Sequence, residues 1–428
     1  MKRWIGLSLC TILSLQAATI GELFEALRKQ PQTRLDAMQA EYTELSAQKV
    51  TDSFYPAASL FASFEHYNAP TNLRPVSPVE NVRLGKEGKP LPFATTIERI
   101  GAKVTMPIFV KELFSLVDKA NARAKSAKAR KRLNFLKNEA VLLGSNARWR
   151  YLESLEKAMH ARKRSIEKMA EDMRVSVESG RAPGVMLDKL EESVNRLEMG
   201  INAIEIEKTQ LKSRIEALTG MTLERPASLA QKREVTGAEF FAAKPVEYAI
   251  EASEHALQAS GDALYPKVTA SAYWSENYGQ GAVGTQSDAG DDVHRGYGNY
   301  MVAVSMPLYE KGRYTAIEQA KVELARERLR LAKTKQELDA ESKALKRSLT
   351  LYGRSEDLAR KSVGNRTRLL AYAKVAFDAG RMTEEEYLRY EEALLDAQSR
   401  VYEAAAKRWE SVAQLAVIYG NDLSDIVE

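Results

Sequence analysis

The hexapeptide "VTMPIF" (104–109) returns almost unchanged as "VSMPLY" (304–309), 200 residues further along the chain. Each copy closes a segment of alternating apolar residues, and each is followed by a long, highly charged tract without proline. Repetition at a fixed spacing is typical of a duplicated structural unit. We expect a strand to end at each proline, Pro107 and Pro307, and a helix to begin there, because proline interrupts a strand ladder and fits the first helical turn.

The repetition extends far beyond the hexapeptides. At the same offset, "VESGRAPGVMLDKLEESVNRLE" (177–198) aligns with "FDAGRMTEEEYLRYEEALLDAQ" (377–398). The dipeptide Gly180-Arg181 then falls on Gly380-Arg381. No gap is needed over this region, so chance is a poor explanation of the match.

A second matched piece lies upstream of the hexapeptides. There "FYPAASLFASF" (54–64) aligns with "LYPKVTASAYW" (264–274) at an offset of 210. Only the stretch between the matched pieces differs in length, and length variation is typical of exposed loops. The sequence therefore predicts two internal structural repeats, 19–220 and 221–428.

Four short segments alternate apolar and polar residues with the period of a β-strand. The apolar positions are Ala58, Leu60, Ala62 and Phe64; Ile100, Ala102, Val104 and Met106; Val268, Ala270, Ala272 and Trp274; and Tyr300, Val302, Val304 and Met306. We expect strands near 57–68, 97–107, 266–277 and 298–307, each about ten residues long, which is the length of a tilted membrane strand. The same alternation would also suit a small soluble sheet that is half covered by helices.

The remaining segments show the three-and-four spacing of apolar residues that is typical of coiled-coil helices. The expected helices are 20–52, 110–178, 183–219, 239–263, 310–378 and 383–419. The tract 110–178 would be about 100 Å long at 1.5 Å per residue, and its return helix only half as long. Lys208 and Arg408 interrupt the apolar seams of the two return helices at equivalent positions.

The amino-terminal stretch has the organisation of a secretory signal. Two basic residues precede an apolar run (4–15), and small residues follow it. We expect residues 1–18 to be a signal peptide that is cleaved near Ala17 or Ala18. The single cysteine, Cys10, lies inside this segment, so we expect no disulfide in the exported protein.

Composition excludes several classes of protein. The chain is 44% hydrophobic and 28% charged, which is too apolar for disorder and too charged for a bundle of membrane helices. The 63 basic and 58 acidic residues are interleaved, so no nucleic-acid partner is indicated. Beyond the signal segment no stretch approaches 18 consecutive apolar residues, and a membrane would have to be crossed by a β-barrel.

With these features, the chain resembles the outer membrane efflux protein family, the TolC-like channels, over essentially its whole expected mature length. The resemblance is carried by the two Gly-Arg turns, the helix ends "LTG" and "IYG", the "YP" strand openings and the V-[TS]-M-P junctions. It implies a mainly α fold with a β-barrel contribution. A long α-helical coiled-coil barrel would stand in the periplasm, and four transmembrane strands per protomer would close a 12-stranded barrel in a homotrimer.

The resemblance also implies a function. The trimer would be the outer membrane exit duct of a tripartite efflux or type I secretion system, and would receive substrate from an inner-membrane transporter and a periplasmic adaptor. The alternative is a periplasmic coiled-coil scaffold or adaptor without a membrane barrel.

By position, the resemblance places the adaptor contact and the gate at the two helical turns. The candidate residues are Gly180, Arg181, Gly380 and Arg381, with the neighbouring acids Glu178, Asp378, Glu384, Glu385 and Glu386. Threefold repetition of an acid would give a ring of negative charge at a narrow mouth. Alternatively, the three glutamates 384–386 only stabilise a helix N-terminus, with Thr383 as its cap.

No pattern of residues indicates an enzyme, a metal centre or a cofactor site. The four histidines, His66, His160, His255 and His294, show no ligand spacing, and the aspartates near His294 indicate an exposed acidic loop. "GQGAVG" (279–284) satisfies GxGxxG but leads into a loop, so no helix terminus awaits a phosphate.

Overall fold

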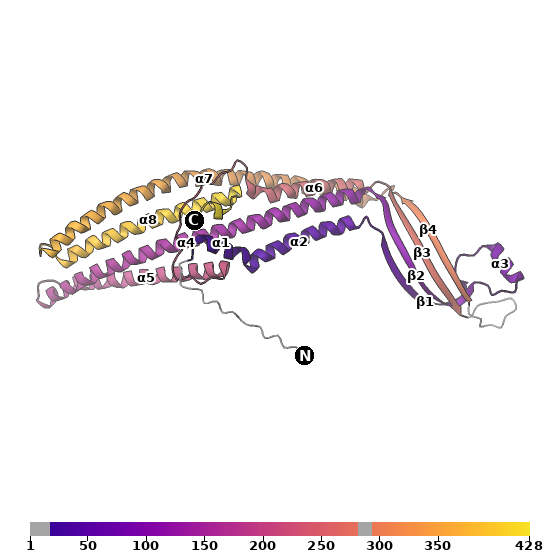
Figure 1. Ribbon diagram of the computed structural model, residues 1–428, viewed down its shortest axis with the longest axis horizontal. Coiled ribbons are helices and arrows are strands. Elements are labelled where there is room, and N and C mark those ends of the chain that lie inside the picture. The colour runs from indigo at the N-terminus through magenta and orange to yellow at the C-terminus, as the bar shows by residue number, and fades with distance from the viewer. Residues whose placement is uncertain (1–17, 281–292) are drawn as a thin grey trace. The chain divides into compact units, whose positions relative to one another are not determined.

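The structure of the chain, a computed structural model, describes residues 18–280 and 293–428 (Figure 1). The helices are α1 (Ile20–Lys29), α2 (Pro31–Asp52), α3 (Pro78–Lys86), α4 (Lys111–Glu178), α5 (Gly184–Thr219), α6 (Lys244–Asp262), α7 (Lys311–Asp378) and α8 (Glu384–Tyr419), and the strands are β1 (Ala57–Asn72), β2 (Phe93–Val110), β3 (Lys267–Gln280) and β4 (Val293–Ser305). The predicted class, mainly helical with a four-stranded contribution, is confirmed. The expected signal peptide, Cys10, most of "GQGAVG" and the aspartates near His294 lie outside the described residues.

None of the described helices is both long enough and apolar enough to cross a membrane.

The described chain divides into two compact units. The helical unit comprises the described residues up to Ala40 together with 127–245 and 331–428, and the sheet unit comprises 41–126 and the described part of 246–330. Each unit draws on both halves of the sequence, so the repeat boundaries stay a prediction from the sequence.

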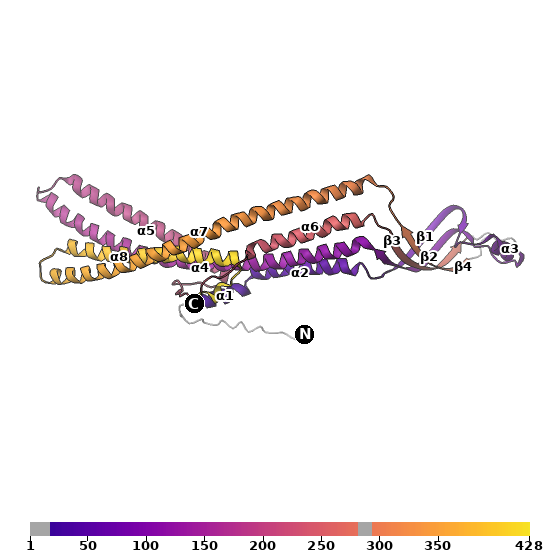
Figure 2. The same ribbon diagram turned by 90° about the horizontal axis from the view of Figure 1, so that it is seen from above.

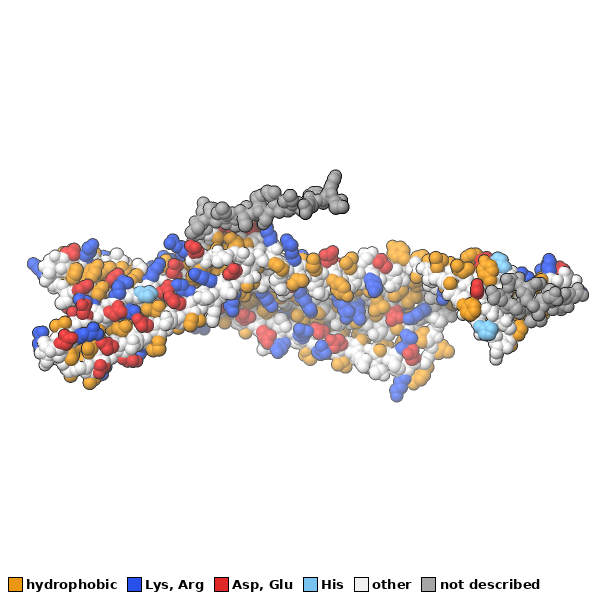
Figure 3. All heavy atoms as spheres, turned by 90° about the horizontal axis from the view of Figure 1, so that it is seen from below, with side chains coloured by type: hydrophobic (Ala, Val, Ile, Leu, Met, Phe, Trp, Pro, Cys, Tyr) orange, Lys and Arg blue, Asp and Glu red, His pale blue; other side chains and the backbone are white. Residues whose placement is uncertain are grey.

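The sheet unit is built on one antiparallel sheet with the strand order β1-β2-β3-β4. Even-numbered residues of β1 and β2 share a face with even-numbered residues of β3 and β4, as the register Ala58–Val104–Ala272–Tyr300 shows. None of the described residues covers this apolar face: Leu60 is 87% exposed and Tyr300 is 92% exposed. Hydrophobic side chains gather over the strands, whereas charged side chains of both signs are interspersed over the helices (Figure 3).

Pro107 does not end its strand as predicted, and neither proline lies in a helical first turn. β2 continues to Val110, with Pro107 opposite Thr269 on β3 and a register shift just after it. Thr105 is the last residue of β2 that pairs with β1, so the missing N–H of Pro107 breaks no bond to that strand. Pro307 lies beyond Ser305, the last residue of β4, and before Lys311, where α7 begins.

The helical unit has one main hydrophobic core where several helices meet. It contains Leu23 and Phe24 of α1, Trp149 of α4, Ile215 of α5 and Val412 of α8. The segment that follows α5 is fixed over α4 by Asn146, whose side chain bonds the carbonyl (3.0 Å) and the N–H (2.8 Å) of Ala227. The expected helix 20–52 is broken at Gln30, because Pro31 restricts the residue before it to an extended conformation.

The residues that interrupt the two apolar seams form ion pairs with the long helices. Lys208 of α5 contacts Glu156 of α4 at 2.5 Å, and Arg408 of α8 contacts Glu356 of α7 at 3.1 Å. The two carboxylates are again 200 residues apart, and both are largely buried. Each interruption is therefore a charge that a facing acid compensates.

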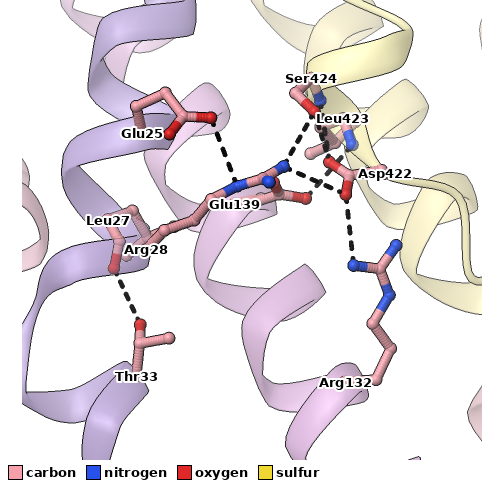
Figure 4. A network of polar contacts seen from close by, with 9 residues as sticks. All are labelled: Glu25, Leu27, Arg28, Thr33, Arg132, Glu139, Asp422, Leu423 and Ser424. Atoms are coloured by element: carbon pink, nitrogen blue, oxygen red, sulfur yellow. Dashed lines mark hydrogen bonds and ion pairs between the residues drawn. The ribbon is translucent and has the colours of Figure 1, made fainter.

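A carboxyl pair joins α4 to the segment that follows α8 (Figure 4). Glu139 is fully buried and accepts a hydrogen bond from the N–H of Leu423 at 3.2 Å. Asp422 beside it contacts Arg28 at 3.4 Å and Arg132 at 3.2 Å. Burial, together with the hydrogen bond and charge of Asp422, raises the pKa of Glu139 to about 8, so this acid is mostly protonated at neutral pH.

Candidate functional site

The two helical turns that the sequence singles out have the same backbone geometry. Gly180 (φ 70°) and Gly380 (φ 68°) are both left-handed. The N–H of Gly180 bonds the carbonyl of Val177 at 2.9 Å, and the N–H of Arg181 bonds the carbonyl of Ser176 at 2.8 Å, with the same two distances in the second turn. This is the Schellman motif, in which glycine follows the last helical turn and the next residue closes the outer bond. The glycines therefore shape the turns, and the arginine side chains take no part in the Schellman bonds.

The two arginines differ in what their side chains contact. Arg181 donates to the hydroxyl of Ser179 at 2.8 Å. Arg381 is exposed, and none of the described residues bonds its guanidinium. Glu178 and Asp378, which close the two long helices, are exposed as well. The structure thus presents two cations and two acids on the surface of the turns.

The three glutamates at the start of α8 have three different partners. Glu386 forms a capping box with Thr383, with bonds of 3.1 and 3.2 Å. Glu385 contacts Arg389 at 2.5 Å on its own helix. Glu384 contacts Lys168 of α4 at 3.5 Å. Helix capping thus accounts for Glu386, and only Glu384 connects the second turn to another helix.

Three ion pairs connect α4 to α8 near the turns, and we call them the α4–α8 ion pairs. They join Lys168 to Glu384 (3.5 Å), Arg164 to Glu391 (3.2 Å) and Arg162 to Glu392 (3.5 Å). All three are partly exposed, so each contributes less than about 1 kcal/mol to stability.

Sequence reasoning missed these basic residues. Positions 362, 364 and 368 in the second copy hold Ser, Gly and Arg, so the repeat does not mark all three of them. Because α4 carries many charged residues, the spacing of these three basic residues alone does not predict that they contact α8.

The surfaces of the two turns are partly apolar, and the exposed residues differ between the copies. Val175, Val185 and Met186 flank the first turn and are 50–61% exposed. Tyr372 and Val375 precede the second turn and are both 70% exposed. Both turns lie at the same end of the helical unit, where α4 lies beside α5 and α7 beside α8 in Figures 1 and 2. Surfaces that combine apolar and charged side chains in this way are suited to protein contacts.

Comparison with solved structures places this architecture among known folds. The outer membrane protein VceC from Vibrio cholerae superposes with a TM-score of 0.70 at 16% identity, covering 94% of this chain and 96% of that one. The Campylobacter jejuni CmeC outer membrane channel gives a TM-score of 0.70 at 13% identity, covering 95% of this chain and 85% of that one. The chain has the TolC-like fold. The open state of the Neisseria gonorrhoeae MtrE outer membrane channel, with a TM-score of 0.66, 13% identity and coverage of 95% and 90%, shares it.

No protein-family model and no curated protein matches this chain by sequence. Within residues 18–280 and 293–428 of this TolC-like fold, no group of three or more histidines, cysteines or acids is placed to hold a metal ion.

Proposed function

We propose that this chain is the outer membrane exit duct of an export system. Three copies would close one 12-stranded barrel, and their helices would form a tunnel in the periplasm. The duct would conduct substrate passively, from an inner-membrane transporter through a periplasmic adaptor to the outside. The similar structures are an outer membrane protein and two outer membrane channels, which supports this assignment.

The sheet supports this role most directly, because it has two different faces and two open edges. Its apolar face is exposed, and among the described residues β1 and β4 each pair with a single strand. In lipid, unpaired backbone groups at these edges would be strongly unfavourable, so the edges must meet other copies. Two copies would give eight strands, whose interior is filled by side chains, whereas three copies give twelve and leave room for a channel.

The duct is tested by fractionation and conductance. We expect the protein in the outer membrane fraction, as a detergent-resistant trimer that heating converts to a monomer, and we expect it to form ion channels in planar bilayers. Recovery as a soluble periplasmic protein would instead support the coiled-coil scaffold.

The α4–α8 ion pairs supply a mechanism for a gate at the turns. They tie α8 to α4 near the candidate adaptor contact, and their exposure keeps each one weak enough to break. We infer that they hold the narrow end closed, and that an adaptor docking on the turns would separate them.

Charge reversal tests this gate. The triple change Glu384→Lys, Glu391→Lys and Glu392→Lys places like charges opposite Lys168, Arg164 and Arg162. We expect a conductance several-fold above that of the unchanged protein in planar bilayers.

The matched control is Glu198→Lys. It breaks the contact of 2.6 Å between Glu198 and Lys163, which joins α4 to its own return helix α5. We expect this variant to conduct like the unchanged protein. Equal conductance of the triple variant and the control would remove the ion pairs from the gate.

A further inference from the structure

The odd-numbered face of the sheet, which we call the polar face, carries a cluster of aromatic rings. Phe61 of β1 stacks on Tyr273 of β3 with a centroid distance of 5.2 Å and an interplanar angle of 23°. Tyr273 also contacts Tyr297 of β4 at 6.0 Å. We call these three half-buried residues the ring cluster. It runs across the sheet on the face opposite to the apolar one.

A glycine on β2 makes room for the cluster. A Cβ added to Gly101 would lie 2.7 Å from Cζ of Phe61, closer than side-chain contacts allow. The ring of Phe61 therefore lies over the backbone of Gly101 and reaches Tyr273 across the intervening strand. The rings form a preformed platform, because Gly101 has no side chain that would occupy the space beneath them.

Basic residues surround the ring cluster on the same face. Lys103 is paired in register with Tyr273 and is exposed. None of the described residues supplies a carboxylate to Lys103. Arg295 precedes Tyr297 on the same face of β4. Its guanidinium contacts the carbonyls of His294 (2.7 Å) and Pro90 (3.3 Å).

Among the described residues of the strands, Glu65 is the one acid on this face, and it contacts Arg99 at 3.2 Å. Lys267, on the same face, is paired with Glu112 of α4 at 2.7 Å. Lys103 and Arg295 thus remain as uncompensated charges among the described residues of the face. Aromatic faces by themselves attract cations, but these two charges repel them and attract anions.

We propose that the ring cluster and Lys103 form a binding site for organic anions that carry an aromatic ring. The ring of the ligand would stack on the cluster, and its anionic group would meet the ammonium of Lys103. The inference rests on the proposed function, because in a closed barrel the polar face lines the lumen. Threefold repetition would then place three such sites at one level of the duct, and passage of ring-bearing anions would be favoured.

Block of single channels in planar bilayers tests the site, with 2-naphthalenesulfonate as the probe and 2-naphthylmethylammonium as its cationic counterpart. We expect the sulfonate to reduce the current at lower concentration than the cation. Lys103→Gln should raise the half-blocking concentration of the sulfonate about tenfold, because a charge-assisted contact is lost. Lys103→Arg should retain the block.

Two tyrosines provide a matched test and control for the rings: Tyr273 on β3 is the test and Tyr300 on β4 is the control. Tyr273→Leu removes a ring from the cluster and should weaken the block. Tyr300→Leu removes a ring from the apolar face, where it contacts none of the cluster, and should leave the block unchanged.

The outcomes separate the two proposals. Failure of the unchanged protein to form channels would overturn the duct and the site with it. Channels that the sulfonate blocks equally in Lys103→Gln and in the unchanged protein, or that the cation blocks better, would overturn the site and leave the duct standing.

Discussion

At the scale of single residues, the Gly-Arg turns owe their shape to a backbone that only glycine adopts without strain. Left-handed geometry is disfavoured by about 1–2 kcal/mol for other residues, and both turns use it once. The arginine that follows contributes its N–H to the turn, whatever its side chain does. This separates a structural role of the glycines from a functional role of the arginines.

We therefore predict that Gly380→Ala loosens the second turn by about 1–2 kcal/mol. Hydrogen–deuterium exchange would show this loosening as faster amide exchange of residues 376–381. Gly364→Ala is the control, because Gly364 lies in α7 with a right-handed backbone and open space around a new Cβ. Equal exchange in the two variants would contradict the account of the turn.

The buried acid Glu139 makes stability depend on pH. Its pKa is raised to about 8 in the folded protein against an ordinary value of 4.5, so the folded state holds a proton that the unfolded state loses between these values. Stability should therefore fall as pH rises from about 5 to 8, by at most about 1.4 kcal/mol per pH unit from this group. The pKa of Asp422 is lowered: burial alone would raise it, but hydrogen bonds from Ser424 and Glu139 and the charge of Arg132 outweigh burial.

Glu139→Gln tests this dependence. The amide keeps the shape, can donate to Asp422 and can accept from the N–H of Leu423, but it does not titrate. Thermal unfolding at pH 5, 6, 7 and 8 should show a smaller loss of melting temperature in the variant than in the unchanged protein. Parallel profiles would show that Glu139 is not the group responsible.

At the scale of elements, the two long helices have equal lengths of 68 residues and the two return helices have equal lengths of 36. Each return helix faces its long helix with an apolar seam that one ion pair interrupts. Removing one partner of such a pair leaves a largely buried charge, whereas replacing both partners by apolar residues leaves none.

Lys208→Met should therefore lower the free energy of unfolding by about 2 kcal/mol, because Glu156 loses its partner. The double variant Lys208→Met and Glu156→Leu should recover to within about 1 kcal/mol of the unchanged protein. Chemical denaturation in detergent measures both values. A double variant as unstable as the single one would show that the pair stabilises the seam directly.

What the sequence could predict at this scale was local. The period-two strands and the charged heptads depend only on neighbours in the chain, and the structure has strands and helices there. Pro31 also carried the signal for the break at Gln30, which the expectation of one helix over 20–52 overlooked. The continuation of β2 through Pro107 depends on where β1 begins, and the α4–α8 ion pairs join residues more than 200 positions apart. Neither of these two features can be predicted from a local sequence pattern.

At the scale of the whole molecule, the proposed roles of the sheet and of the turns can be separated by one substitution. Arg381→Glu changes an exposed side chain and leaves the backbone bond of Arg381 in place. We predict that export falls while the yield of trimer stays the same, because the change affects only the proposed adaptor contact. Cell-associated substrate and trimer migration are the two measurements, and normal export by the variant would remove Arg381 from that contact.

Four amphipathic strands per copy, open at both edges, would close a barrel only by association. Electron cryomicroscopy of protein extracted from the outer membrane can count the strands around the barrel. We predict twelve strands in a threefold assembly, with β1 of each copy beside β4 of the next. A single copy with four strands and two free edges would rule out this assembly.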